Sequence, residues 1–141
     1  MAVKSYNPAS VFIIVGPVPI VGYADGTFIT AGRVNDAFTM GSGADGEGWR
    51  AKSNDRTGVI TLTLLQSSLS NVGLSALAAL DETSGDGVVP FLMKDISGTT
   101  ILAAETCWIT KFADVERARE LSTVEWSIST DSLIMTVGGI L

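Results

Sequence analysis

The amino-acid sequence predicts a mainly β fold, an antiparallel β-sandwich or barrel of about eight strands with one short α-helix. Apolar and polar residues alternate over residues 59–66, the pattern of a strand with one buried face. Helical spacing of apolar residues is evident in one segment, 71–80. Strands therefore do not alternate with helices, as they would in a parallel α/β sheet.

Four strands are predicted before residue 41. The first has apolar residues on both faces, so we expect both faces to be covered. Two prolines bend the chain, and an edge strand follows, where proline is tolerated. Asp25-Gly26 is a two-residue hairpin signal that leads into the third strand, and Gly32 separates the third from the fourth. The predicted strands are residues 7–15, 18–23, 27–31 and 33–40.

The segment at about 40–58 is rich in glycine and charged residues, and we expect a flexible arm that buries little in its own domain. Tryptophan and arginine are enriched at the centres of protein interfaces, so Trp49 and Arg50 are candidate anchors into a neighbouring copy. The alternative is that Trp49 folds back onto its own sheet. The candidate interface residues are Asp45, Glu47, Trp49, Arg50, Lys52, Asp55 and Arg56.

The second half of the chain alternates helix, strands and one charged loop. Capping hydroxyls at 67–70, or Asn71, begin the helix at 71–80. Trp108 and Trp126 occupy regular positions in strands and are expected in the core. Beyond Asp131 the apolar residues change from even to odd positions, so residues 130–132 must form a bulge, bend or turn. The remaining predictions are strands at 88–95, 99–112 and from 121, and a solvated loop at 114–120.

Composition limits the possible functions. The 141 residues, 46% of them apolar, suffice for a single domain, 1–141, with a real core. Only 17% are charged, so much of the surface must be uncharged or buried against partners. Histidine is absent, which removes Ser-His and Cys-His nucleophile pairs and the commonest zinc ligand. The lone Cys107 lies in an apolar strand pattern and is expected to be a buried structural thiol.

The net charge of −6 opposes nonspecific binding to nucleic acid, which needs lysines and arginines against phosphates. Asp45 and Glu47 suggest a calcium loop, but the spacing of a helix-loop-helix site is absent. The glycines of 41–48 lack the lysine and hydroxyl of a phosphate-binding loop. We therefore predict a protein that is not an enzyme and has no catalytic, cofactor or metal site.

The segment from Val11 to Ala24 imitates a secretory signal peptide. Pro17 and Pro19 break its apolar run, and Tyr6-Asn7-Pro8 interrupts its approach. We expect no cleaved signal and no membrane span, because the run is too short and too broken to cross a bilayer.

The order of these features resembles the tail-tube proteins of contractile-tailed bacteriophages. The resemblance spans nearly the whole chain and is most specific over 22–81. It implies hexameric rings that stack into a hollow tube inside a contractile sheath, in a virion assembled in the cytoplasm of the bacterial host. By position, the arm would contact the adjacent ring. The segments that carry the resemblance are GYADGTFITAGRVNDAFTM, GADGEGWRAKSNDRTG, VITLTLLQSS, SNVGLSALAALDE and VEWSIST.

The resemblance also implies partners. They are further copies of the chain, the sheath protein, and the baseplate and tail-terminator proteins. The tape-measure protein and genome DNA would pass through the lumen without sequence-specific binding, which suits an acidic chain. Alternatives are a secretion-system tube subunit, another phage structural protein such as a terminator or decoration protein, and a small carbohydrate- or calcium-binding β-domain.

Overall fold

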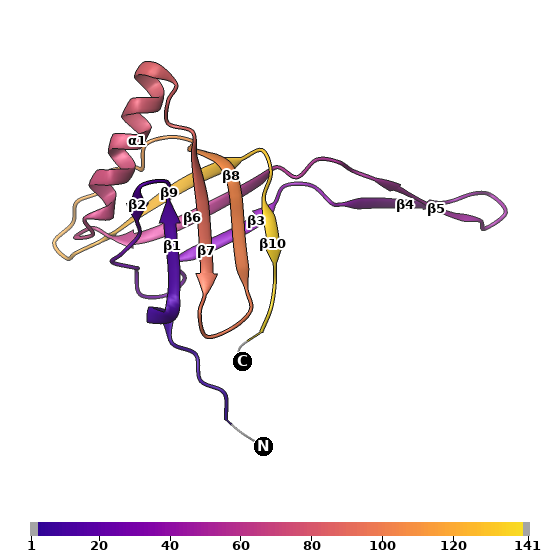
Figure 1. Cartoon of the computed structure of the whole chain (residues 1–141), viewed down its shortest axis with the longest axis horizontal. Helices are drawn as coiled ribbons and strands as arrows, with labels where there is room; N and C mark the ends of the chain where they lie inside the picture. The colour runs from indigo at the N-terminus through magenta and orange to yellow at the C-terminus, as the bar shows by residue number, and fades with distance from the viewer. Residues whose placement is uncertain (1–2, 140–141) are drawn as a thin grey trace.

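The computed structural model describes residues 3–139 and is mainly β, as predicted (Figure 1). Its main sheet has eight antiparallel strands, and two further strands form a separate sheet. The elements are a 3-10 helix Pro8–Ser10, β1 (Val11–Val15), β2 (Val18–Pro19), β3 (Ile29–Arg33), β4 (Phe38–Ser42), β5 (Gly48–Lys52), β6 (Gly58–Leu65), α1 (Ser70–Ser84), β7 (Val89–Asp95), β8 (Ile101–Ile109), β9 (Thr123–Thr130) and β10 (Ile134–Thr136).

The main sheet runs in the order β2-β1-β7-β8-β9-β6-β3, and β10 also pairs with β8. One edge of β8 is shared by two strands, because residues 101–103 pair with β10 and residues 107–109 pair with β9. The sheet divides at this point. β2 and β3 stand at its two ends. Beside β2 the Ser70 hydroxyl donates to the Pro19 carbonyl and accepts from the Val21 N–H, so it is β3 that has an edge a neighbouring strand could use.

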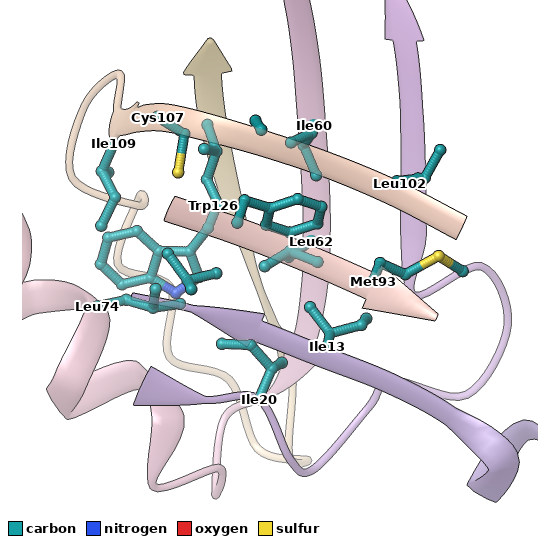
Figure 2. Close-up of a cluster of buried hydrophobic side chains, with 14 of the residues drawn as sticks. Ile13, Ile20, Ile60, Leu62, Leu74, Met93, Leu102, Cys107, Ile109 and Trp126 are labelled. Atoms are coloured by element: carbon teal, nitrogen blue, oxygen red, sulfur yellow. The ribbon is translucent and has the colours of Figure 1, made fainter. Parts of the chain in front are cut away.

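The core lies between the strands and the helix. Ile60, Leu62 and Leu64 of β6 are fully buried, which confirms the alternation predicted there. Leu74 and Leu77 of α1 pack into the same cluster. Figure 2 shows how side chains from β1, β6, β7, β8, β9 and α1 converge on one another. The segment that imitates a signal peptide supplies β1, whose inward residues are almost completely buried.

Helix α1 is longer at its C-terminal end than the predicted 71–80. It ends at Gly85, whose φ of 73° allows its N–H to bond the Asp81 carbonyl. At its start, Leu69 caps the helix without a side-chain hydrogen bond, and the Ser68 hydroxyl accepts from the N–H of Ser70 at 3.2 Å. Asn71 does not cap the helix. Its side-chain amide instead hydrogen-bonds the Trp126 indole and the backbone of β6.

Two strand predictions near the N-terminus are wrong. Asp25-Gly26 does not close a hairpin, since β2 pairs with β1 while β3 pairs with β6. The strand expected at 33–40 does not exist as one element, because β3 ends at Arg33 and β4 begins at Phe38. The first error concerns the choice of a strand's partner, and the second concerns where a strand ends; both depend on residues distant in sequence.

The predicted core residues divide. Trp126 and Cys107 are buried, whereas Trp108 is only partly buried, on the opposite side of β8 from Cys107. The predicted break at 130–132 is confirmed, since Thr130 and Leu133 both face the core across it. On β1, Phe12 remains 44% exposed, so the second face that we expected to be covered is open in the single chain.

Candidate assembly interface

The arm between β3 and β6 is a β-hairpin that projects from the rest of the molecule (Figure 1). β4 and β5 pair antiparallel from Phe38↔Lys52 to Ser42↔Gly48. The tip is closed by hydrogen bonds between Gly43 and Glu47, at 2.8 Å, and between Gly46 and Gly43, at 2.9 Å. The segment that we expected to be a long flexible arm thus includes a paired hairpin, with residues 40–42 and 48–52 in its two strands.

The register gives the hairpin two unlike faces. Residues directly opposite each other point to the same side of an antiparallel pair. Phe38 and Met40 therefore share a side with Lys52 and Arg50, and we name these four residues the basic face. The Arg50 guanidinium carbon lies 4.4 Å from the centre of the Phe38 ring, a cation–π contact between the two strands.

The other face is uncharged and is dominated by Trp49, which stands opposite Gly41. The indole lies against Gly41 so closely that a Cβ there would overlap its ring atoms. Trp49 does not fold back onto the main sheet: it packs on its own hairpin and is still 57% exposed. Only glycine at position 41 leaves room for this arrangement.

The hairpin leaves large apolar side chains uncovered. Met40 is 89% exposed and Phe38 is 45% exposed on the basic face, and Trp49 is exposed on the opposite face. Apolar groups gathered on a projecting element, among charged neighbours, are typical of an interaction surface. Sequence reasoning missed Phe38 and Met40, because the apolar alternation of 33–40 assigned them to a strand of the main sheet.

A hydrogen-bonded neck joins the hairpin to the main sheet. The N–H of Val34 bonds the Thr57 carbonyl at 3.0 Å, and the N–H of Ser53 bonds the Ala37 carbonyl at 2.7 Å. The Asp55 carboxylate accepts from the backbone N–H of Thr57 at 2.9 Å and from the Asn35 side chain at 2.6 Å. Hydrogen bonds from Thr57, and then from Asn35, lower the pKa of Asp55.

The structure distributes the seven candidate residues over three parts of this element, and all seven are exposed. Asp45 and Glu47 lie at the tip, where the Asp45 carboxylate accepts the N–H of Glu47 at 3.1 Å. Trp49, Arg50 and Lys52 lie in β5. Asp55 and Arg56 belong to the neck, with the Arg56 carbonyl accepting the N–H of Leu133 at 2.9 Å.

Within residues 3–139, no three His, Cys, Asp or Glu side chains are grouped as a metal ion requires. Over the same residues, no helix has the length and apolar character needed to cross a membrane.

The sequence was compared with known families. Residues 20–138 match the family model of the bacteriophage PhiTE tail tube protein. This chain belongs to that phage tail tube family. Structural protein ORF10 of Pseudomonas phage KPP10 is 26% identical over 144 aligned residues, which cover 96% of this chain and 83% of that protein. As a family member, the chain is a phage tail structural protein and a component of the virion.

The fold is also similar to a solved structure. The tube-terminating cap of the anti-feeding prophage superposes with a TM-score of 0.57, over 96% of this chain and 94% of the cap. The two sequences are 9% identical, so the similarity concerns the fold alone.

Proposed function

We propose that the chain is the repeating subunit of a phage tail tube, without catalytic activity. It forms hexameric rings, and the rings stack into a hollow tube that conducts genome DNA during ejection, inside a contractile sheath. Membership of the tail tube family carries this proposal. Residues 1–141 act as one domain, and the hairpin of β4 and β5 reaches the adjacent ring.

Three structural features support assembly. The hairpin exposes apolar and charged side chains away from its own core. The main sheet ends at one side in β3, whose outer edge can join a neighbouring subunit in a ring. Phe12 on β1 leaves a further apolar position uncovered. The interface residues proposed from the sequence are Asp45, Glu47, Trp49, Arg50, Lys52, Asp55 and Arg56, to which we add Phe38 and Met40.

A DNA conduit needs a wall that does not hold phosphates. The outer faces of β6 and β9 suit that role, because these strands contain no lysine or arginine. Thr61 and Thr63 of β6 lie on the side opposite the buried leucines. They stand opposite Ser127 and Glu125 of β9, and Ser129 lies on the same face. A surface of hydroxyls with one carboxylate is wetted by water and offers no cation to the DNA backbone.

Negative-stain electron microscopy and sedimentation of the purified protein test the proposal. Rings and tubes are expected as the protein concentration rises. A protein that stays monomeric over a wide concentration range contradicts it. A sheath gene upstream and a tape-measure gene downstream would distinguish a contractile phage tail from a secretion-system tube. Assembly in the host cytoplasm, with sheath, baseplate and terminator proteins as partners, belongs to the same proposal.

A second candidate is a tube terminator, favoured by the similarity to the anti-feeding prophage cap. A terminator ends a tube, whereas a tube subunit extends it. Rings that never stack on one another, but bind the end of a preformed tube, would select this alternative.

A further inference from the structure

A hollow lined with carboxylates lies at the other end of the molecule from the hairpin. It has a volume of about 320 Å³ and lies between the loop that follows β8 and the outer face of β9. Asp114, Glu116 and Glu125 line it together with a single cation, Lys111. The Lys111 ammonium lies 3.9 Å from the Asp114 carboxylate, so two carboxylates remain for an incoming cation. We name this the acidic hollow.

Apolar side chains border the acidic hollow. Phe112 lines it and is 40% exposed, whereas the exposed Val115 of the same loop lines a neighbouring hollow. A carboxylate-lined hollow with an exposed aromatic ring in its wall fits a partner surface that mixes cations with apolar side chains.

The basic face of the hairpin has that composition. Arg50 and Lys52 supply two positive charges, and Phe38 and Met40 supply exposed apolar surface between them. The three carboxylates and one ammonium of the hollow give a formal charge of −2, which two cations balance. The charges of the two surfaces are therefore complementary: the hollow has unpaired carboxylates, and the basic face has two cations.

The positions of the two surfaces decide how copies of the chain would join. Figure 1 shows the hairpin at one end of the long axis, and the loop leading into β9 at the other. One chain's hairpin cannot reach its own hollow across that length. Contact between unlike surfaces of two copies is head-to-tail, and it produces rings or open stacks rather than a closed dimer.

We infer that the acidic hollow is the docking site for the basic face of the hairpin of a second copy. This inference rests on the proposed function and specifies the surface that receives the hairpin in the neighbouring subunit. The hollow takes up β9 from Thr123 to Ser127, so Ser127 belongs to the hollow, while Ser129 and the threonines of β6 stay available for the proposed lumen.

Lys52 and Glu125 are the two residues that test the docking site best. Lys52 stands opposite Phe38 but is not a member of the Arg50–Phe38 contact, so reversing its charge removes neither partner of that contact. Glu125 is exposed on β9, so reversing its charge leaves the core intact.

The test uses two full-length variants, Lys52→Glu and Glu125→Lys. Each places like charges across the contact, so each alone should raise the protein concentration needed for assembly by at least about tenfold. Mixing the two variants restores opposite charges at every contact between unlike copies. The hairpin of the Lys52→Glu variant then meets the charge-reversed hollow of the Glu125→Lys variant, and the other hairpin meets a native hollow. The mixture should therefore assemble although neither component does.

Two exposed positions outside both surfaces provide matched controls. Lys4→Glu, ahead of the 3-10 helix, and Glu82→Lys, near the C-terminal end of α1, make the same charge changes and should assemble as the wild type does. Urea unfolding of every variant checks that folding is unaffected.

Three results would overturn the inference. One is assembly of either single variant at the wild-type concentration, and another is a mixture that stays unassembled. If the wild type itself forms no rings or tubes, the proposed function fails and this inference fails with it. Wild-type tubes that are insensitive to both reversals reject only the docking site.

Discussion

The guanidinium of Arg33 donates two hydrogen bonds to the carbonyl oxygen of Leu133, from Nε at 3.0 Å and from Nη2 at 2.9 Å. Arg33 is the last residue of β3, where the chain leaves the main sheet for the hairpin, and Leu133 immediately precedes β10. The contact joins the base of the hairpin to a segment 100 residues away.

Replacing Arg33 with Met should lower the free energy of unfolding by about 1–2 kcal/mol. Hydrogen bonds to a charged group contribute about 1.5–3 kcal/mol, and solvent competes at this exposed position. Urea unfolding measures the loss, with Lys94→Met as a control that removes an exposed cation elsewhere. Equal stability of the two variants would show that the Leu133 contact contributes nothing.

Replacing Trp49 with Ala should impair assembly more than folding. Its exposed indole packs on Gly41 of the hairpin alone, so the free energy of unfolding should change by less than about 1 kcal/mol. A central interface tryptophan typically contributes about 2 kcal/mol or more to association, which is a factor of about 30 in the assembly concentration. Light scattering and urea unfolding measure the two quantities.

Trp126→Ala is the comparison for that experiment. The Trp126 side chain is buried in the core, and its removal should cost about 3–5 kcal/mol of folding free energy. If Trp49→Ala also destabilised the monomer strongly and still assembled normally, its proposed role at the interface would be wrong.

Asn71→Leu should destabilise the fold by about 1–3 kcal/mol, the cost of a buried polar group left without a partner. The Asn71 side-chain oxygen accepts from the Trp126 indole N–H at 3.0 Å, and its nitrogen donates to the Leu65 carbonyl at 3.1 Å. The leucine variant leaves the indole N–H unpaired. Adding Trp126→Phe removes that donor, so the loss in the double variant should be smaller than the sum of the two single losses.

Acid should loosen the neck of the hairpin. Hydrogen bonds from Thr57 and Asn35 hold the pKa of Asp55 below its ordinary value of 3.8. Because the carboxyl has a lower pKa in the folded state, its ionisation stabilises the fold at pH values above the ordinary pKa. This stabilisation is lost as the pH falls through the pKa of the folded state. NMR titration of Asp55, with amide exchange at Thr57, should show the neck opening below about pH 4. The Asp55→Ala variant should lack this pH-dependent step.

Cys107 should resist alkylation in the folded protein. Burial raises the pKa of its thiol to about 11, so at pH 8 only about one thiol in a thousand is the reactive thiolate. Iodoacetamide should modify the protein far faster in urea than in buffer. Equal rates in both solutions would mean that the thiol is accessible in the fold.

Part of the architecture could be predicted because it follows from local periodicity. β6 was recognised from its alternation, since every second residue must face the core. The break between Thr130 and Leu133 was recognised because a change of parity cannot occur inside a regular strand. The partly buried Trp108 shows the limit, because alternation does not say which face of a strand another element will cover.

The position of the candidate site in the chain could be predicted from the sequence, but its hairpin structure could not. Glycine and charge marked the segment around Trp49, yet its two strands carry no buried face, so no periodicity revealed the hairpin. Phe38 and Met40 resembled core residues because an exposed apolar side chain and a buried one look alike in sequence.

By itself, the amino-acid sequence determined the mainly β class, the helix that follows β6, and a segment unsuited to the core. These depend on the side-chain pattern of neighbouring residues. The tertiary structure decided that β3 pairs with β6, that the arm is a two-faced hairpin, and that an acidic hollow lies at the opposite end of the molecule. Those features arise when residues distant in the chain are brought together, and local propensity carries no information about that choice.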